Sequence, residues 1–355
     1  MKTIGRHSRT RAPAKLVRGM GFFPILILSL SGCAPNLVTD TLDPRDLSPP
    51  SVTAWEAVGS REYRIDFDED VSAEGADFLI SPPLGALEVA ADGNRLSILA
   101  EAGADSGGRL TLEGTVRDAA GNETLFVLPF WGYNPRLPRT LINEARTQGS
   151  SAHPDAVELR VLEPGNLAGL TFFVGTRAHS ALRYVFPSCE VSAGEFIVLH
   201  LKPQGLPEEV DETEDVTASG GLDATGGARD FWYPGDDGAL PGENGSMTLY
   251  ASPTGSLRDA LLYSARTSES DTKYSGFGTR ALLDQANDIV VASGWSTEGP
   301  NVRPEDAARS SGTTSTRTLC RFSDSADTDS DSDWHVVPTK CSTIGAENSD
   351  EIYSP

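Results

Sequence analysis

The sequence predicts an all-β protein made of two tandem β-sandwiches. Its 355 residues include 35 glycines and 23 prolines, and its hydrophobic content is 38%, a composition typical of short strands joined by long loops. Apolar and polar residues alternate in segments such as Tyr63–Phe67, the period of a half-buried strand. Between residues 51 and 134 no helical period extends over three turns. The chain is too long for one small core and suits two domains.

The first 32 residues have the features of an export signal. Six basic residues and no acidic one precede an apolar core from Met20 to Leu30. This core is too short to cross a bilayer as a helix. Small residues follow it, and then Cys33.

The segment Leu30–Cys33 resembles the lipobox of bacterial lipoproteins. The resemblance implies that residues 1–32 are removed and that Cys33 is acylated and begins the mature chain. Residues 33–50 contain four prolines and are expected to form a disordered tether. We therefore expect an exported protein that is anchored by acyl chains to the inner or outer membrane of the cell envelope. The alternative is an ordinary secretory signal in which Cys33 has no role.

The charge of the chain excludes some partners. It has 29 basic and 51 acidic residues and a net charge of −22, and loss of the leader makes the mature chain more acidic still. Such a charge repels nucleic acid and anionic headgroups. Membrane attachment is therefore expected to depend on the acyl chains alone.

Residues 51–134 are expected to form the first sandwich. Strand signals recur around Tyr63–Phe67, Leu96–Ile98, Leu110–Leu112 and Phe126–Leu128, and Asp92–Asn94 is a hairpin candidate.

Two motifs in this domain resemble those of bacterial Ig-like domains found in surface-layer proteins. They are Phe67–Ser72, a strand and turn, and Val116–Asn122, the closing turn, with Asp70 replacing the usual proline. The resemblance implies an Ig-like fold in which Asp118 is a scaffold residue and not a catalyst. An aspartate can accept backbone N–H bonds in such a turn.

Residues 135–139 are expected to be a stiff linker, and residues 140–348 a second sandwich, followed by a tail at 349–355. Leu141–Ala145 and Ala156–Arg160, with later pieces up to Gly345–Asn348, resemble the lamin-tail domain, which is also an Ig-like sandwich. Two long inserts, near 202–245 and 264–312, depart from that family. The whole arrangement, including the segment Arg229–Gly235, resembles a family of treponemal lipoproteins.

Besides Cys33, three cysteines remain, and export favours disulfides. Cys320 and Cys341 are closest in sequence and are the candidate pair. Cys189 with either of them is the alternative.

Alternate carboxylates in one turn suggest a calcium site, because they can converge on one hard cation. The turn does not follow the EF-hand pattern, since Ser332 and Pro338 occupy the glycine and glutamate positions. An acidic turn without a metal is the alternative, and no other cofactor is indicated. The four candidate ligands are Asp327, Asp329, Asp331 and Asp333.

The sequence contains no nucleophile elbow, zinc-protease motif or phosphate-binding loop. We therefore expect a non-catalytic surface or periplasmic interaction or adhesion module with a protein or glycan partner. The alternative is an exported hydrolase with an unrecognised metal or Ser/His/Asp site in the second domain.

The first insert is the predicted binding site. Three consecutive aromatic residues, Phe231, Trp232 and Tyr233, follow Arg229 in an acidic, glycine-rich stretch. Aromatic residues are favoured at recognition hot spots. We expect Trp232 to be the exposed anchor and the carboxylates to select a basic or cation-bearing partner. The alternative is that the insert folds back and two of the three aromatics pack on the sandwich.

Overall fold

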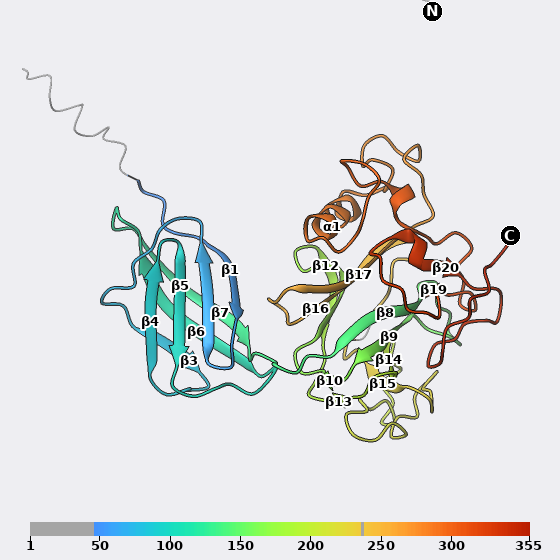
Figure 1. Cartoon of the computed structure of the whole chain (residues 1–355), viewed down its shortest axis with the longest axis horizontal. Coiled ribbons are helices and arrows are strands. Elements are labelled where there is room, and N and C mark those ends of the chain that lie inside the picture. The colour runs from blue at the N-terminus through green and yellow to red at the C-terminus, as the bar shows by residue number, and fades with distance from the viewer. Residues whose placement is uncertain (1–45, 236–237) are drawn as a thin grey trace, which may run out of the picture. The chain divides into compact units, whose positions relative to one another are not determined.

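The computed structural model describes residues 46–235 and 238–355. The predicted signal peptide, Cys33 and most of the predicted tether lie outside the described residues. Almost all regular structure in the described chain is strand, and the strands form two groups with separate hydrophobic cores (Figure 1). The predicted all-β sandwich fold is therefore confirmed.

The first sandwich consists of a four-stranded and a three-stranded sheet, both antiparallel. The first has the order β1 (Val52–Ala57), β2 (Glu62–Phe67), β5 (Arg95–Ala100), β4 (Leu87–Asp92). The second has the order β3 (Phe78–Ser81), β6 (Arg109–Arg117), β7 (Glu123–Trp131).

The core of the first sandwich follows the alternation seen in the sequence. Tyr63, Ile65 and Phe67 of β2 are all buried, whereas the intervening residues are partly exposed. The predicted hairpin joins β4 to β5, and Gly93 adopts a φ of 58° at its tip, a backbone conformation that glycine tolerates best. The period-two pattern thus identified both the strand and its inward face.

The second sandwich has a six-stranded and a five-stranded sheet. The six-stranded sheet runs β15 (Arg229–Trp232), β14 (Phe196–His200), β9 (Ala156–Glu163), β8 (Arg139–Arg146), β19 (Leu319–Arg321), β20 (Trp334–Val336). The five-stranded sheet runs β12 (Ser180–Val185), β11 (Thr171–Gly175), β16 (Asn244–Tyr250), β17 (Leu257–Ser264), β18 (Ala308–Arg309). A small ladder joins β10 (Gly165–Asn166) to β13 (Glu190–Val191).

The second insert is more ordered than its composition suggests. It contains helix α1 (Arg280–Val291), whose N-cap Thr279 accepts a hydrogen bond from the amide of Leu282. Leu282, Ala286 and Ile289 are the buried residues of the helix, a spacing that gives one apolar face. The described elements also include two short 3₁₀ segments, Pro304–Asp306 and Asp331–Asp333.

The first insert contributes a strand to the sandwich. β15 pairs in parallel with β14, with Leu199 opposite Phe231 and His200 opposite Trp232. The predicted aromatic segment is therefore an edge strand of the six-stranded sheet and not a free loop.

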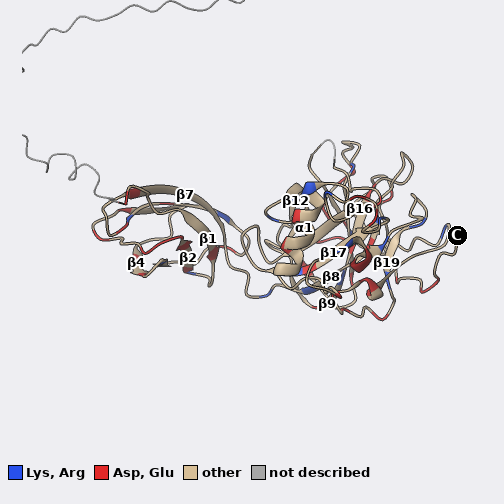
Figure 2. Cartoon of the chain, turned by 90° about the horizontal axis from the view of Figure 1, so that it is seen from above, with Lys and Arg blue, Asp and Glu red and all other residues tan. Residues whose placement is uncertain are grey.

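Acidic residues are spread over strands and loops of both sandwiches (Figure 2). Within the described residues, no helix is both long enough and apolar enough to cross a membrane.

Candidate functional site

A pocket of about 720 Å³ lies at the first insert, beside the edge strand β15. We call it the insert pocket. Two segments line it, residues 203–211 and residues 232–235. The second segment begins at the end of β15, so the sheet fixes one wall of the pocket while the acidic loop forms the other.

Trp232 is not the exposed anchor that the sequence suggested, because its side chain is only 7% exposed. Its ring stacks on the imidazole of His200 at a centroid distance of 4.1 Å. Its Nε1 donates a hydrogen bond of 2.9 Å to Ser219 Oγ. The absence of a side chain at Gly221 leaves room for the far edge of the indole. Trp232 is therefore a largely buried part of the pocket wall and stabilises it.

Phe231 and Arg229 are also buried. The Phe231 ring packs edge-on against Phe186, with the centroids 5.3 Å apart, inside the core. Arg229 forms an ion pair with Glu195 at 3.2 Å and donates to the carbonyl of Glu212 at 2.7 Å. Alternating strand residues point to opposite faces, but the folded-back loop covers the outer face here, so both faces of β15 are buried.

Tyr233 is the aromatic residue of the triplet that keeps an accessible side chain. It is partly buried against the core and lines the insert pocket. Its amide donates to the carbonyl of His200 at 2.9 Å, which extends the pairing of β14 and β15 by one residue. Two of the three aromatic residues, Phe231 and Trp232, are therefore buried. This is the alternative that the sequence analysis offered, in which the insert folds back onto the sandwich.

Two carboxylates line the insert pocket, and both are held by uncharged donors. Glu209 accepts hydrogen bonds from the amides of Gln204, Gly205 and Leu206 at 2.6–2.9 Å. Asp211 accepts from the Trp232 amide at 2.8 Å and from the Tyr184 hydroxyl at 3.0 Å.

Within the described chain, Glu209 and Asp211 have no lysine or arginine within ion-pair distance. Glu209 is anchored by amides of its own loop, whereas the donors to Asp211 come from distant segments of the chain.

The predicted calcium ligands lie in three different environments. Asp327 and Asp329 lie near Asp259 of β17, with one oxygen of each within 4.8 Å of the others. Asp333 instead binds Arg321 at 3.2 Å and accepts from Thr328. Asp331 is exposed at the start of a 3₁₀ segment. The four aspartates therefore do not converge on one point.

A buried guanidinium offsets part of the negative charge of this acidic group. Arg321 is 1% exposed and forms ion pairs with Asp259 at 3.1 Å, Asp327 at 3.3 Å and Asp333 at 3.2 Å. Burial raises the pKa of Asp259 to about 7, although Arg321 and the Ile142 amide act in the opposite direction. A calcium site in this turn stays a prediction.

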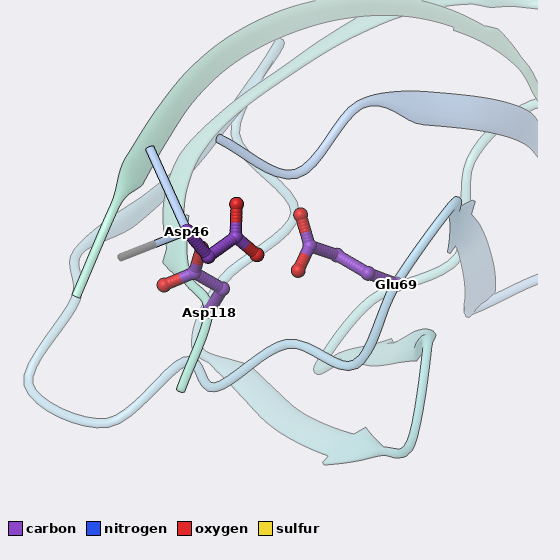
Figure 3. A group of neighbouring side chains, drawn as sticks. All are labelled: Asp46, Glu69 and Asp118. Carbon is purple, nitrogen blue, oxygen red and sulfur yellow. The ribbon is translucent and has the colours of Figure 1, made fainter. Parts of the chain in front are cut away.

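A second acidic group lies in the first sandwich, where Asp46, Glu69 and Asp118 offer oxygens within 4.8 Å of one another. Figure 3 shows the carboxylates of Glu69 and Asp46 pointing toward each other. Partial desolvation, followed by the nearby charges of Asp118 and Asp46, raises the pKa of Glu69. Asp118 accepts from the amide and side chain of Asn122 at 2.8 and 2.6 Å. These bonds fit the scaffold role that we expected for Asp118.

The predicted Cys320–Cys341 disulfide does not form in the structure, and Cys189 is free as well. Cys320 lies in β19 with its thiol 4.0 Å from a carboxylate oxygen of Glu144. The Cys341 thiol lies instead near the carbonyl of Thr339. Burial raises the pKa of both Cys189 and Cys320, which disfavours the reactive thiolate.

Each of three histidines pairs with one aspartate: His153 with Asp223, His179 with Asp288, and His200 with Asp230. The fourth histidine of the described chain, His335, contacts the carbonyl of Ser349 at 2.8 Å. The four histidines are thus scattered, and within the described residues none meets two carboxylates in one pocket.

Comparison with known proteins finds a matching family and a similar protein. A family model described as "TP_1001_2nd, protein second domain" matches residues 138–336. A protein of Treponema pallidum (strain Nichols), described as an uncharacterized protein, is 38% identical over 159 residues. That match covers 44% of this chain and 39% of the relative. The chain spans well under half of this relative's length. On the strength of the family match, which extends over more than half of its residues, the chain belongs to the TP_1001_2nd protein second-domain family.

Proposed function

We propose that this protein is a lipid-anchored, non-catalytic interaction module of a bacterial cell envelope, which binds a cation-bearing protein partner at the insert pocket. The observation that carries the proposal is the pocket itself. It combines an accessible aromatic ring, Tyr233, with two anchored carboxylates, Glu209 and Asp211. An interaction module needs such a preformed concave surface on a rigid scaffold.

Charge complementarity supports a basic partner. Glu209 and Asp211 receive only uncharged donors, so their negative charge is not cancelled locally by a lysine or arginine of the described chain. The wider chain has a net charge of −22, which attracts a cationic partner over longer distances. A lysine or arginine in the pocket would offset the two carboxylates and increase the rate of association.

The ring of Tyr233 supports the same partner chemistry. A cation within about 6 Å of an aromatic face is attracted by the ring quadrupole. Tyr233 takes over the anchor role that the sequence suggested for Trp232. Trp232 would act indirectly, because its stack on His200 holds the strand end from which Tyr233 projects.

The lamin-tail resemblance supports a structural rather than catalytic role for the most polar buried residues. Asn143 donates buried hydrogen bonds to Glu158 at 2.6 Å and to Asn348, near the C-terminus, at 2.8 Å. Thr343 and Gly345 donate their amides to Glu144 and Glu158, respectively. These bonds hold the C-terminal segment against the six-stranded sheet. Such a role is structural, as expected if these residues serve to maintain a lamin-tail-like sandwich. The Ig-like assignment of residues 51–134 is proposed on the same basis.

The hydrolase alternative receives less support. Its Ser/His/Asp version requires a histidine placed between a nucleophile and a carboxylate. In the described chain the buried His200 contacts Asp230 and stacks on Trp232, an arrangement that explains its burial without a catalytic role. His153 and His179 each contact one aspartate near the surface.

Binding of a labelled peptide tests the proposal. The probe is an N-acetylated hexapeptide of alternating lysine and glycine, and the readout is fluorescence anisotropy with full-length protein in non-ionic detergent. Tyr233→Ala and Glu209→Gln should each weaken binding by roughly tenfold. Tyr133→Ala is the matched control, because Tyr133 is 41% exposed and lies outside the pocket. Equal affinities for all three variants would overturn the proposal.

A further inference from the structure

A second pocket, of about 420 Å³, has the opposite chemistry to the insert pocket. We call it the arginine pocket. Three basic side chains line it, those of Arg146, His153 and Lys340, together with a single carboxylate, Asp223. Four hydroxyl-bearing residues also line it: Thr225, Ser315, Thr316 and Ser342. In a chain with a net charge of −22, a pocket dominated by basic and hydroxyl side chains differs sharply from its surroundings.

Arg146 is the central feature of this pocket. It is 7% exposed, and Nε is buried without a hydrogen-bond partner in the described chain. The bonds that the guanidinium makes to described residues come from Nη1, to Asp223 at 2.6 Å and to the carbonyl of Pro154 at 3.2 Å. The edge formed by Nε and Nη2 is therefore left without a protein acceptor among those residues. Two parallel N–H groups of this kind are the donors with which arginine side chains bind oxyanions in a bidentate manner.

Two residues of this pocket adopt backbone conformations that are costly outside glycine. Asp223 has a φ of 63° and Lys340 a φ of 66°, and such outliers cluster at ligand-binding sites. Asp223 also contacts His153 at 3.1 Å, so it orients both Arg146 and the imidazole.

The C-terminal segment completes the pocket because it is fixed to the buried sheet. The Thr343 amide donates to Glu144 at 3.0 Å, and the Ser342 hydroxyl donates to the same carboxylate at 3.0 Å. The Lys340 amide donates to the carbonyl of Thr316 at 3.0 Å. Lys340 is thereby held at the pocket by a rigid backbone, although its side chain is exposed.

We propose that the arginine pocket binds the phosphoryl group of a small ligand, with Arg146 and Lys340 as the charged contacts and the hydroxyl groups of Thr225, Ser315 and Thr316 as further donors. Arginine suits a phosphate through paired N–H donors, and lysine through its point charge. Asp223 neutralises only part of the basic charge, so a net positive site remains. The proposal is independent of the insert pocket, which attracts the opposite charge.

Isothermal titration calorimetry of the full-length protein in non-ionic detergent tests this site. The three probes are inorganic phosphate, glycerol 3-phosphate and short-chain dihexanoyl phosphatidic acid. Arg146→Lys keeps the charge but removes the bidentate edge, and should weaken binding by roughly tenfold. Lys340→Gln should weaken it by roughly three- to tenfold. Lys273→Gln is the control, because Lys273 is exposed, packs on Tyr274 and lies outside the pocket.

Two variants are needed because one of them, Arg146→Lys, could lose binding through misfolding alone. Arg146 is buried, so Arg146→Lys is interpreted only if its melting temperature stays near that of the wild type, whereas Lys340→Gln changes an exposed side chain. A preference for glycerol 3-phosphate would assign the phosphoryl group to a soluble ester, and a preference for phosphatidic acid to a lipid headgroup. Absence of binding to all three probes, or binding that Lys340→Gln leaves unchanged, overturns the proposal. The lysine–glycine peptide should bind Lys340→Gln as tightly as it binds the wild type. The two binding proposals are therefore tested independently of each other.

Discussion

Glu144 of β8 and Glu158 of β9 are direct partners across the two strands, and both side chains are completely buried. Desolvation, followed by the charge of Glu144, raises the pKa of Glu158 well above its ordinary value of 4.5. The folded state therefore binds a proton that the unfolded chain releases near pH 4.5. Glu158 then contributes stability below that pH, and the contribution is lost as the pH rises through the folded pKa.

Glu158→Gln should reduce this dependence on pH. The amide keeps the shape of the protonated acid but cannot ionise. We expect the melting temperature of the wild type to fall from pH 4.5 upward more steeply than that of the variant, as measured by calorimetry over a series of buffers. Glu163→Gln, an exposed change on the same strand, should retain the wild-type slope. Parallel curves for Glu158→Gln and the wild type would contradict the predicted coupling.

Arg321 is predicted to stabilise the second sandwich strongly. Replacement by methionine leaves Asp259 and Asp333 buried without their cation, and breaking a buried pair in this way costs about 3–5 kcal/mol. Urea denaturation measures the loss. Arg280→Met is the control, since it breaks an exposed pair with Asp284, for which a much smaller loss is expected. A comparable small loss for both variants would mean that Arg321 is not the counter-ion of this cluster.

Trp232 and Tyr233 should respond differently to truncation. Trp232→Ala removes a buried ring that stacks on His200, and such a change costs about 3–5 kcal/mol of stability. Tyr233→Ala should cost less, because the side chain is only partly buried. Thermal unfolding compares them. If Trp232→Ala melts at the wild-type temperature, the indole does not support the pocket wall.

Three strands of the first sandwich, β2, β5 and β6, could be predicted because each alternates between a buried and a more exposed face. β15 could not. Its residues are all buried, since the acidic loop covers the outer face, and this removes the alternation that reveals a strand. The exposed anchor predicted at Trp232 was wrong for the same reason.

Helix α1 has features in the sequence that would have predicted it. Thr279 is a standard N-cap residue, and Leu282, Ala286 and Ile289 follow at helical spacing. Neither pocket has a comparable pattern in the sequence. Glu209 and Tyr233 are 24 positions apart and meet only when β15 joins the sheet. Arg146 and Lys340 lie near the two ends of the sequence of the second sandwich but line the same pocket. No local sequence pattern could have predicted that they are close in space.

Lipid anchoring is predicted to depend on Cys33. In cells of a bacterium that processes lipoproteins, Cys33→Ala should prevent acylation, so the protein should leave the detergent phase in a phase-partition assay. The wild type should remain in that phase and incorporate labelled palmitate. A Cys33→Ala protein that still carries the label would show that the lipobox interpretation is incorrect.

Chemical-shift mapping tests the central claim most directly, because it locates the contact on the molecule. Backbone amide spectra of the full-length protein are recorded as the lysine–glycine hexapeptide is added. We predict that the largest changes fall in the two segments of the insert pocket, residues 203–211 and 232–235, and that they disappear in Tyr233→Ala. Changes centred instead on the acidic turn at Asp327–Asp333, or spread evenly over the acidic loops, would contradict a specific binding site at the insert pocket.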